Sequence, residues 1–243
     1  MGREFELGKE VELEASPEVV WDAIATGPGI DSWFMGPHTV EPGIGGKMSI
    51  DLGDFHDEST ITAWDPPKRF AYKTEPGPDG TFHAMEYLIE GREGGSTVLR
   101  FVHNGFLSDE WGTEYESQTS HGWDMYLHTL GQYVKYFPGE PGTYVFVQAP
   151  ETTDAWDKLL AGLGLEEPYA AGDPVHLTLD GLPPIDGVID FAVPGFRELL
   201  GIRGTEGLYR FHGGGPSIGL GHHAFGEPHA EAWQSWAERT FRS

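Results

Sequence analysis

The sequence predicts an α+β protein in which one arrangement of antiparallel sheet and helices is written twice, the second time in shortened form. Residues 11–22 read VELEASPEVVWD, and residues 145–157 read VFVQAPETTDAWD. In both segments an alternating strand pattern runs through Ala and Pro-Glu into a helix that carries Trp-Asp. Residues 99–106 (LRFVHNGF) and 218–225 (IGLGHHAF) form a weaker second match, and a Trp-bearing helix follows each. Self-similarity of this kind predicts two copies of one fold.

The first half opens with a strand and two short helical segments. Residues 5–14 alternate apolar and polar side chains, which indicates a half-buried strand. The Ser-Pro-Glu run at 16–18 favours a helix start, because Ser accepts an orphan N–H, Pro has none to lose and Glu complements the helix dipole. The Gly-Pro-Gly run at 27–29 is expected to end that helix, and residues 30–35 to form a second helical turn.

A meander of strands and a long helix complete the first half. Residues 38–104 show only strand and turn patterns, which indicates an antiparallel sheet. Parity in its last strand places His103 on the buried face with Leu99 and Phe101. A helix is expected within residues 113–137, and it should lie across the sheet because both have one apolar face. Its apolar stripe comprises Trp123, Leu127, Leu130 and Val134, and it is broadened by Tyr126, Tyr133 and Phe137.

Length and composition agree with two folded domains. The chain has 243 residues, enough for two domains of ordinary size, and we expect them at residues 1–140 (complete) and 143–243 (shortened). A hydrophobic content of 38%, with 14 Phe, 8 Trp and 9 Tyr, is too rich in large side chains for a disordered chain.

Charge and residue usage exclude several classes of partner and site. The formal net charge is −24 with only 15 Lys and Arg, so we expect no nucleic-acid partner and no binding to a membrane surface. There is no cysteine, which excludes disulfides, thiolate nucleophiles and Cys-based metal sites. Neither a signal-peptide core nor an apolar run of roughly 20 residues is present, so a cytoplasmic location is expected.

Several short motifs occur in an order that resembles the SRPBCC superfamily, whose helix-grip fold is shared by START lipid-binding domains, pollen-allergen-like proteins and polyketide cyclases. Its closest branch here is that of the activators of the heat-shock-protein-90 ATPase. The motifs are ASPEVVW at 15–21, WF at 33–34, GGK at 45–47, DPP at 65–67, VHNGF at 102–106 and HGW at 121–123. The resemblance covers residues 5–137, and the second half resembles a degenerate second copy.

The resemblance implies a curved antiparallel sheet wrapped around a long C-terminal helix, with a cavity between them that holds an apolar small molecule in many relatives. We therefore expect a non-catalytic binder of a lipid-like or polyketide-like ligand, without a cofactor. The expected ligand-binding residues are Trp33, Phe34, Met85, Phe101, His103, Phe106, Trp111, Trp123 and Tyr126. Two alternatives remain: a cyclase or hydrolase using His103 and His121 as an acid/base pair, and a protein-binding module of the chaperone ATPase activator type.

Two histidine-rich patterns raise the question of a metal. His121, Asp124 and His128 have helical spacing and could share one face, although a solvated polar face explains them more simply. His222, His223 and His229 form the second cluster, but Gly226 and Pro228 interrupt any helix that would present them as in a His-Glu-x-x-His site. We therefore expect no metal site, and whether the second cluster binds metal is left open.

Overall fold

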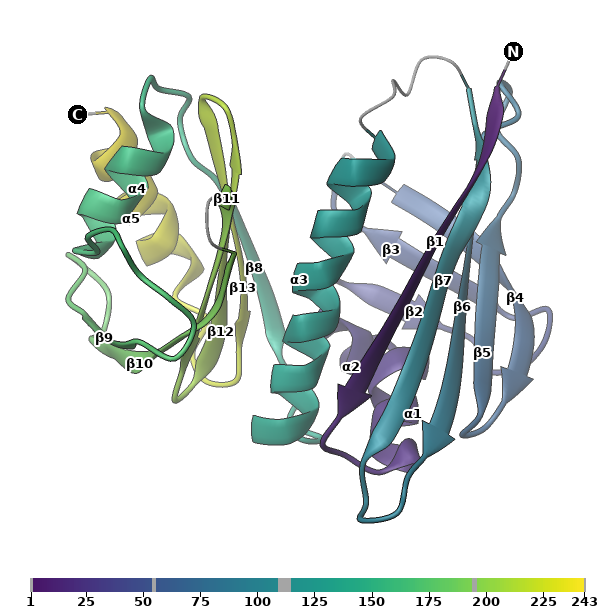
Figure 1. Cartoon of the computed structure of the whole chain (residues 1–243). Helices are drawn as coiled ribbons and strands as arrows, with labels where there is room; N and C mark the ends of the chain where they lie inside the picture. The colour runs from purple at the N-terminus through teal and green to yellow at the C-terminus, as the bar shows by residue number, and fades with distance from the viewer. Residues whose placement is uncertain (1, 54–55, 109–114, 194–195, 243) are drawn as a thin grey trace. The chain divides into compact units, whose positions relative to one another are not determined.

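The computed structural model describes residues 2–53, 56–108, 115–193 and 196–242, and the chain divides into two compact units, Met1–Pro141 and Gly142–Ser243. Each unit has one antiparallel sheet and its own helices (Figure 1). Among the described residues, no helix is long and apolar enough to cross a membrane.

The first unit has a seven-stranded sheet in the order β1-β7-β6-β5-β4-β3-β2. The strands are β1 (Arg3–Leu13), β2 (His38–Val40), β3 (Lys47–Asp51), β4 (His56–Asp65), β5 (Arg69–Thr74), β6 (Phe82–Gly91) and β7 (Thr97–Leu107). The helices are α1 (Pro17–Ala25), α2 (Gly27–Asp31) and α3 (Tyr115–Tyr136). Figure 1 shows α3 running along one side of this sheet.

Local sequence explains where α1 and α2 begin. Ser16 caps α1 by accepting a hydrogen bond from the Val19 amide, and Thr26 caps α2 by accepting one from the Gly29 amide. The second helix therefore begins at Gly27, earlier than the sequence predicted, because Pro28 is tolerated in a first turn that Thr26 caps. At Gly29 an added Cβ would lie 2.1 Å from the Asp22 carbonyl oxygen, so only glycine permits this close approach of α1 and α2.

The core of the first unit forms where α3 meets the sheet. Leu99 and Phe101 of β7 are fully buried, and His103 is 4% exposed, which confirms the parity assignment. The buried stripe of α3 includes Trp123, Leu127, Leu130 and Val134, which confirms the predicted apolar face. Burial of these side chains against the sheet fixes the helix across it.

The second unit repeats this topology with one strand and one helix fewer. Its sheet has the order β8-β13-β12-β11-β10-β9, so the first strand again pairs with the last. The elements are β8 (Thr143–Gln148), α4 (Ala155–Leu163), β9 (Pro174–Leu177), β10 (Ile185–Val193), β11 (Phe196–Gly204), β12 (Gly207–Gly214), β13 (Ser217–Ala224) and α5 (Ala230–Arg242). The α+β helix-grip fold in two tandem copies, the second shortened, is thus confirmed.

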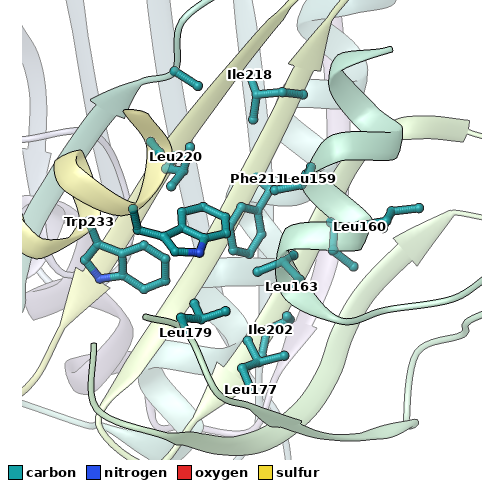
Figure 2. Packing of buried hydrophobic residues seen from close by; sticks show 14 of the residues in the cluster. Leu159, Leu160, Leu163, Leu177, Leu179, Ile202, Phe211, Ile218, Leu220 and Trp233 are labelled. Atoms are coloured by element: carbon teal, nitrogen blue, oxygen red, sulfur yellow. The ribbon is translucent and has the colours of Figure 1, made fainter. Parts of the chain in front are cut away.

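The second unit has a complete hydrophobic core of its own. Figure 2 shows leucines of α4 and Trp233 of α5 gathered over Phe211, Ile218 and Leu220 of the sheet. Phe211 and Leu220 are fully buried, and Trp233 is 2% exposed. Each unit therefore has its own strand pairing and its own cluster of buried apolar side chains.

We predict that residues 1–141 and 142–243, produced separately, each unfold in one cooperative transition. The reason is that each fragment keeps a whole sheet and the helices that cover it. Circular dichroism with a thermal scan measures this. A fragment of residues 1–107, which lacks α3, is the control and should show no cooperative transition. Loss of cooperative unfolding in either complete half would contradict the division into two domains.

Candidate functional site

A cavity of about 340 Å³ lies between the sheet and α3 of the first unit. That volume falls within the range of small-molecule sites. The sheet side contributes Ile50, Asp57, His83, Met85 and His103, from β3, β4, β6 and β7. The helical side contributes Phe34 and Met35, which follow α2, and Tyr115, Thr119, Gly122, Trp123 and Tyr126 of α3.

Aromatic rings form most of one wall. Phe34 stacks on Trp123 with ring centroids 5.4 Å apart and planes 4° apart, and it meets the Tyr126 ring edge-on at 4.5 Å. Behind them the fully buried Phe101 contacts Trp123 with centroids 4.2 Å apart. Contacts of this kind hold large side chains in fixed orientations. The aromatic wall is therefore held together by ring–ring contacts.

The polar part of the lining comprises two histidines, one carboxyl group and the hydroxyl groups of Tyr115, Thr119 and Tyr126. The Trp123 indole Nε1 donates a hydrogen bond to His103 Nδ1 at 3.0 Å, and His103 Nε2 lies 3.1 Å from His83 Nδ1. Asp57 of β4 lines the same cavity and attracts His83 electrostatically. A hydrogen-bonded chain thus runs from the helix through β7 to β6.

Burial shifts the pKa of each of these groups in the direction that favours its neutral form, downward for the histidines and upward for the carboxyl group. Burial, and to a smaller extent the neighbouring His83, lowers the pKa of His103 to about 3. Burial also lowers the pKa of His83, although Asp57 opposes this. The pKa of the Asp57 carboxyl is raised by burial, with the nearby His83 and His56 acting against the shift. His103 is therefore neutral at pH 7.

The family model for activator of Hsp90 ATPase homolog 1-like proteins matches residues 14–135, half of the chain. The chain belongs to this family. Every residue that lines the cavity lies within the matched span. The family assignment confirms the resemblance found in the motifs, and it is consistent with the wider SRPBCC superfamily.

Solved structures resemble part of the chain. They include the conserved protein of unknown function EF2215 from Enterococcus faecalis (22% identity, 54% of this chain and 71% of that one, TM-score 0.44). The Aha1 dimer from Colwellia psychrerythraea is also similar (19% identity, 56% and 99%, TM-score 0.48), as is CalU16 from Micromonospora echinospora (20% identity, 54% and 74%, TM-score 0.43). At these identities the likeness concerns the fold alone. No curated protein matches the chain.

Five of the residues expected at the site line the cavity of this family domain. These residues are Phe34, Met85, His103, Trp123 and Tyr126. Phe101 supports Trp123 from behind and has no exposed surface. Trp111 lies outside the described residues.

Two expected aromatic residues are placed elsewhere. Trp33 is 1% exposed, and its Nε1 donates to the Ala23 carbonyl at 2.9 Å, so it belongs to the core beneath α1. Phe106 lies on the opposite face of β7 from His103, because the two positions differ by three residues along a strand. There it packs beside Gly2 and Gly80.

The expected pair of His103 and His121 is not formed. Both ring nitrogens of His103 are already engaged, by Trp123 and by His83. His121 precedes Trp123 by two residues, and positions two apart face different sides of a helix. Since Trp123 faces the cavity, His121 does not line it.

Sequence reasoning missed seven of the lining residues, including His83, Asp57 and Tyr115. Extending the alternation of Met85, Tyr87 and Ile89 back by two residues places His83 on the inward face. The same parity along β4 places Asp57 on the face of the buried Ser59 and Ile61.

Helical spacing could have placed Tyr115 among the cavity-lining residues. Tyr115, Thr119, Trp123 and Tyr126 recur at intervals of four, four and three on one face of α3. The signals for His83, Asp57 and Tyr115 were therefore present, but each required continuing a pattern past the point where its apolar residues end.

Neither histidine-rich pattern forms a metal cluster within the part of the chain that the structure describes. Asp124 accepts a hydrogen bond from Lys9 Nζ at 2.6 Å, which makes it part of an ion pair. In the second unit His222 is 2% exposed, and its Nδ1 accepts from the Arg210 amide at 3.1 Å. Burial is the main cause that lowers the pKa of His222 well below its ordinary value.

In the second unit, Tyr209 holds the register position that Met85, a cavity-lining residue, holds in the first unit. His222 faces Tyr209 across β12 and β13, as His103 faces Met85 across β6 and β7. The Tyr209 ring lies 5.7 Å from that of Trp233 and 5.2 Å from that of His222. Its hydroxyl comes within 3.0 Å of where a Cβ of Gly207 would be, and Gly207 holds the register position of His83. A phenol side chain therefore fills this place.

We predict that His103 makes the stability of the protein depend on pH. The folded state keeps His103 neutral down to a pKa of about 3, whereas the unfolded chain binds a proton near pH 6.5. The unfolded state thus holds more protons between these values, so stability falls as the pH falls below about 6.5. Between pH 7 and pH 5, the wild type should lose about 2 kcal/mol more unfolding free energy than His103→Gln.

Urea unfolding at both pH values measures this difference. His222 and His212 are present in both proteins, so their contributions cancel in the comparison. His56→Gln, at an exposed position on β4, is the matched control and should behave as the wild type. Parallel pH dependences for the wild type and His103→Gln would show that the prediction is wrong.

Proposed function

We propose that the first unit binds an apolar or aromatic small molecule, lipid-like or polyketide-like, in the cavity between the sheet and α3, without catalysing a reaction. The observation that carries the proposal is the lining: a wall of Phe34, Trp123 and Tyr126, whose rings contact one another, lies with Met85 and a small group of polar side chains around one cavity. Concave apolar sites with a few convergent polar groups are typical of ligand pockets.

The state of His103 favours binding over acid/base catalysis. A general base has to accept a proton near the working pH. His103 has a pKa of about 3, and the Trp123 indole already occupies Nδ1. The cyclase or hydrolase alternative relied on His103 together with His121, and these two residues do not form a pair. Nothing in the geometry of this pair therefore supports that alternative.

Membership of the family favours a second candidate, a module that binds a chaperone and acts on its ATPase. Such a module would use its outer surface, which is strongly acidic in a chain of net charge −24. Changes confined to the cavity should leave that interaction intact. The two candidates therefore make different predictions for a cavity variant.

We predict that Met85→Glu abolishes ligand uptake. It places a charge in an apolar cavity, and binding an apolar molecule next to an unpaired carboxylate is unfavourable. Titration with the neutral fluorophore N-phenyl-1-naphthylamine should show saturable binding by the wild type and at least about tenfold weaker binding by the variant.

Leu88→Glu is the matched control, because Leu88 is 37% exposed on the same strand and faces away from the cavity. It should bind the probe as the wild type does. If the wild type binds neither this probe nor any of a panel of lipids and aromatic polyketides, the proposed function is wrong. If Met85→Glu still stimulates a chaperone ATPase that the wild type stimulates, the second candidate is favoured.

A further inference from the structure

The charge of the cavity lining in the first unit comes from one side chain. Asp57 is the one carboxyl group among the described lining residues, which include no lysine or arginine. Burial lowers the pKa of His103 to about 3 and also lowers the pKa of His83 below its ordinary value of 6.5. Both histidines are therefore neutral at pH 8. The described lining thus carries the negative charge of a single carboxylate.

The neighbours of Asp57 leave this charge in place. Burial raises the pKa of the Asp57 carboxyl, whereas a hydrogen bond from the Glu58 amide and the attraction of His83 and His56 act in the opposite direction. An amide hydrogen bond stabilises a carboxylate without neutralising it, and the two oxygens of a carboxylate accept several hydrogen bonds. Asp57 is therefore a charged group, partly buried in the lining, that can accept a further donor.

Two other carboxylates of the first unit have the basic partner that Asp57 lacks. Glu116 and Asp124 of α3 pair with residues of β1: Glu116 Oε1 lies 3.2 Å from Arg3 Nε, and Asp124 Oδ1 lies 2.6 Å from Lys9 Nζ. Asp57 belongs to β4, which three strands separate from β1 in the sheet. Within the described ranges, Asp57 forms no ion pair with a lysine or an arginine. A positive charge in this cavity is therefore one that a ligand would bring.

We propose that the ligand of the first unit is an organic cation, whose ammonium group pairs with Asp57 and whose apolar body lies along the wall of Phe34, Trp123 and Tyr126. This inference rests on the proposed function and names the class of ligand that the same cavity takes. A neutral ligand would displace water from the carboxylate without compensating its charge, and an anion is repelled by it. An aromatic lining suits a cation, because the faces of aromatic rings carry partial negative charge.

An organic cation fits the lining better than a metal ion does. Among the described residues, no group of three or more His, Asp or Glu side chains is arranged to hold a metal ion. Much of the lining is aromatic or aliphatic, which favours an apolar body attached to the charge. The hydroxyl groups of Tyr115, Thr119 and Tyr126 are uncharged, so they can orient a ligand but do not select the sign of its charge.

Displacement of N-phenyl-1-naphthylamine from the full chain at pH 8 tests the inference with three compounds that share one ring system. These compounds are 2-naphthylmethylamine, which is a cation at this pH, the neutral 2-naphthalenemethanol and the anion 2-naphthoate. The alcohol can donate a hydrogen bond, so comparison with the amine isolates the effect of charge. We expect the amine to bind about tenfold more tightly than the alcohol, because Asp57 is only partly buried. The anion should bind most weakly.

Asp57→Asn tests the origin of this preference. It keeps the size of the side chain and removes its charge, so the ratio between the amine and the alcohol should fall to within about threefold. Asp65→Asn, at an exposed carboxyl on the same strand, is the matched control. It changes the net charge of the chain by the same amount and should keep the wild-type ratio. Circular dichroism checks that both variants are folded.

The outcomes separate the inference from the function on which it rests. If the wild type binds the amine no more tightly than the alcohol, the inference is wrong and apolar binding remains. If Asp57→Asn keeps the preference for the amine, the inference is also wrong, because the charge of the whole chain is then the cause. Failure of the wild type to bind the fluorophore or any of the three compounds would overturn both.

A salt series on the wild type decides the question if Asp57→Asn does not fold. Sodium chloride at about 0.5 M screens the attraction of distant surface charges, and it screens a partly buried contact pair much less. A ratio between the amine and the alcohol that persists in this salt supports pairing inside the cavity. A ratio that falls to within about threefold would overturn the inference.

Discussion

The hydrogen bond from the Trp123 indole to His103 joins the long helix to the sheet in the first unit, at 3.0 Å and in a buried position. Both partners are large, and each contacts further rings: Trp123 meets Phe34 and Phe101, and His103 meets Phe5. Separating helix and sheet would leave a buried indole N–H and an imidazole nitrogen without partners. This one bond therefore ties α3 to β7 beside the cavity, fixes the tautomer of His103 and orients the Trp123 ring.

The second unit keeps the residues of this junction and changes their bonding. His222 and Trp233 still meet, with ring centroids 4.4 Å apart. However, the Nδ1 of His222 accepts from the Arg210 backbone amide and not from an indole. A duplicated motif has thus retained its packing while the hydrogen bond that orients the first copy has been replaced. The two copies thus share the fold but not this hydrogen bond, and a shared fold does not imply a shared site.

Much of the fold could be predicted from the sequence because its signals are periodic and local. Alternation gave the strands and placed His103 inward, and the helical stripe placed Trp123 against the sheet. The partner of His103 could not be predicted in this way, because it depends on which residue of β6 lies beside β7. Register between strands is set by turn lengths and by side-chain packing that one sequence does not reveal. Trp33 and Phe34 make the same point, since adjacent aromatic residues enter the core and the cavity respectively.

Tyr209 makes the two units differ in whether a side chain of the chain itself fills the place beside the strand histidine. Its ring is part of the chain and packs against the core of the second unit, so placing it there costs none of the translational entropy that a bound small molecule would lose. The first unit has a cavity at the corresponding place, and under the proposed function its occupant comes from solution. By mass action, the stability of the first unit then varies with the concentration of what it binds, while that of the second stays constant. Under the proposed function, one chain thus combines a domain whose stability is linked to a ligand with a shortened copy that lacks this linkage.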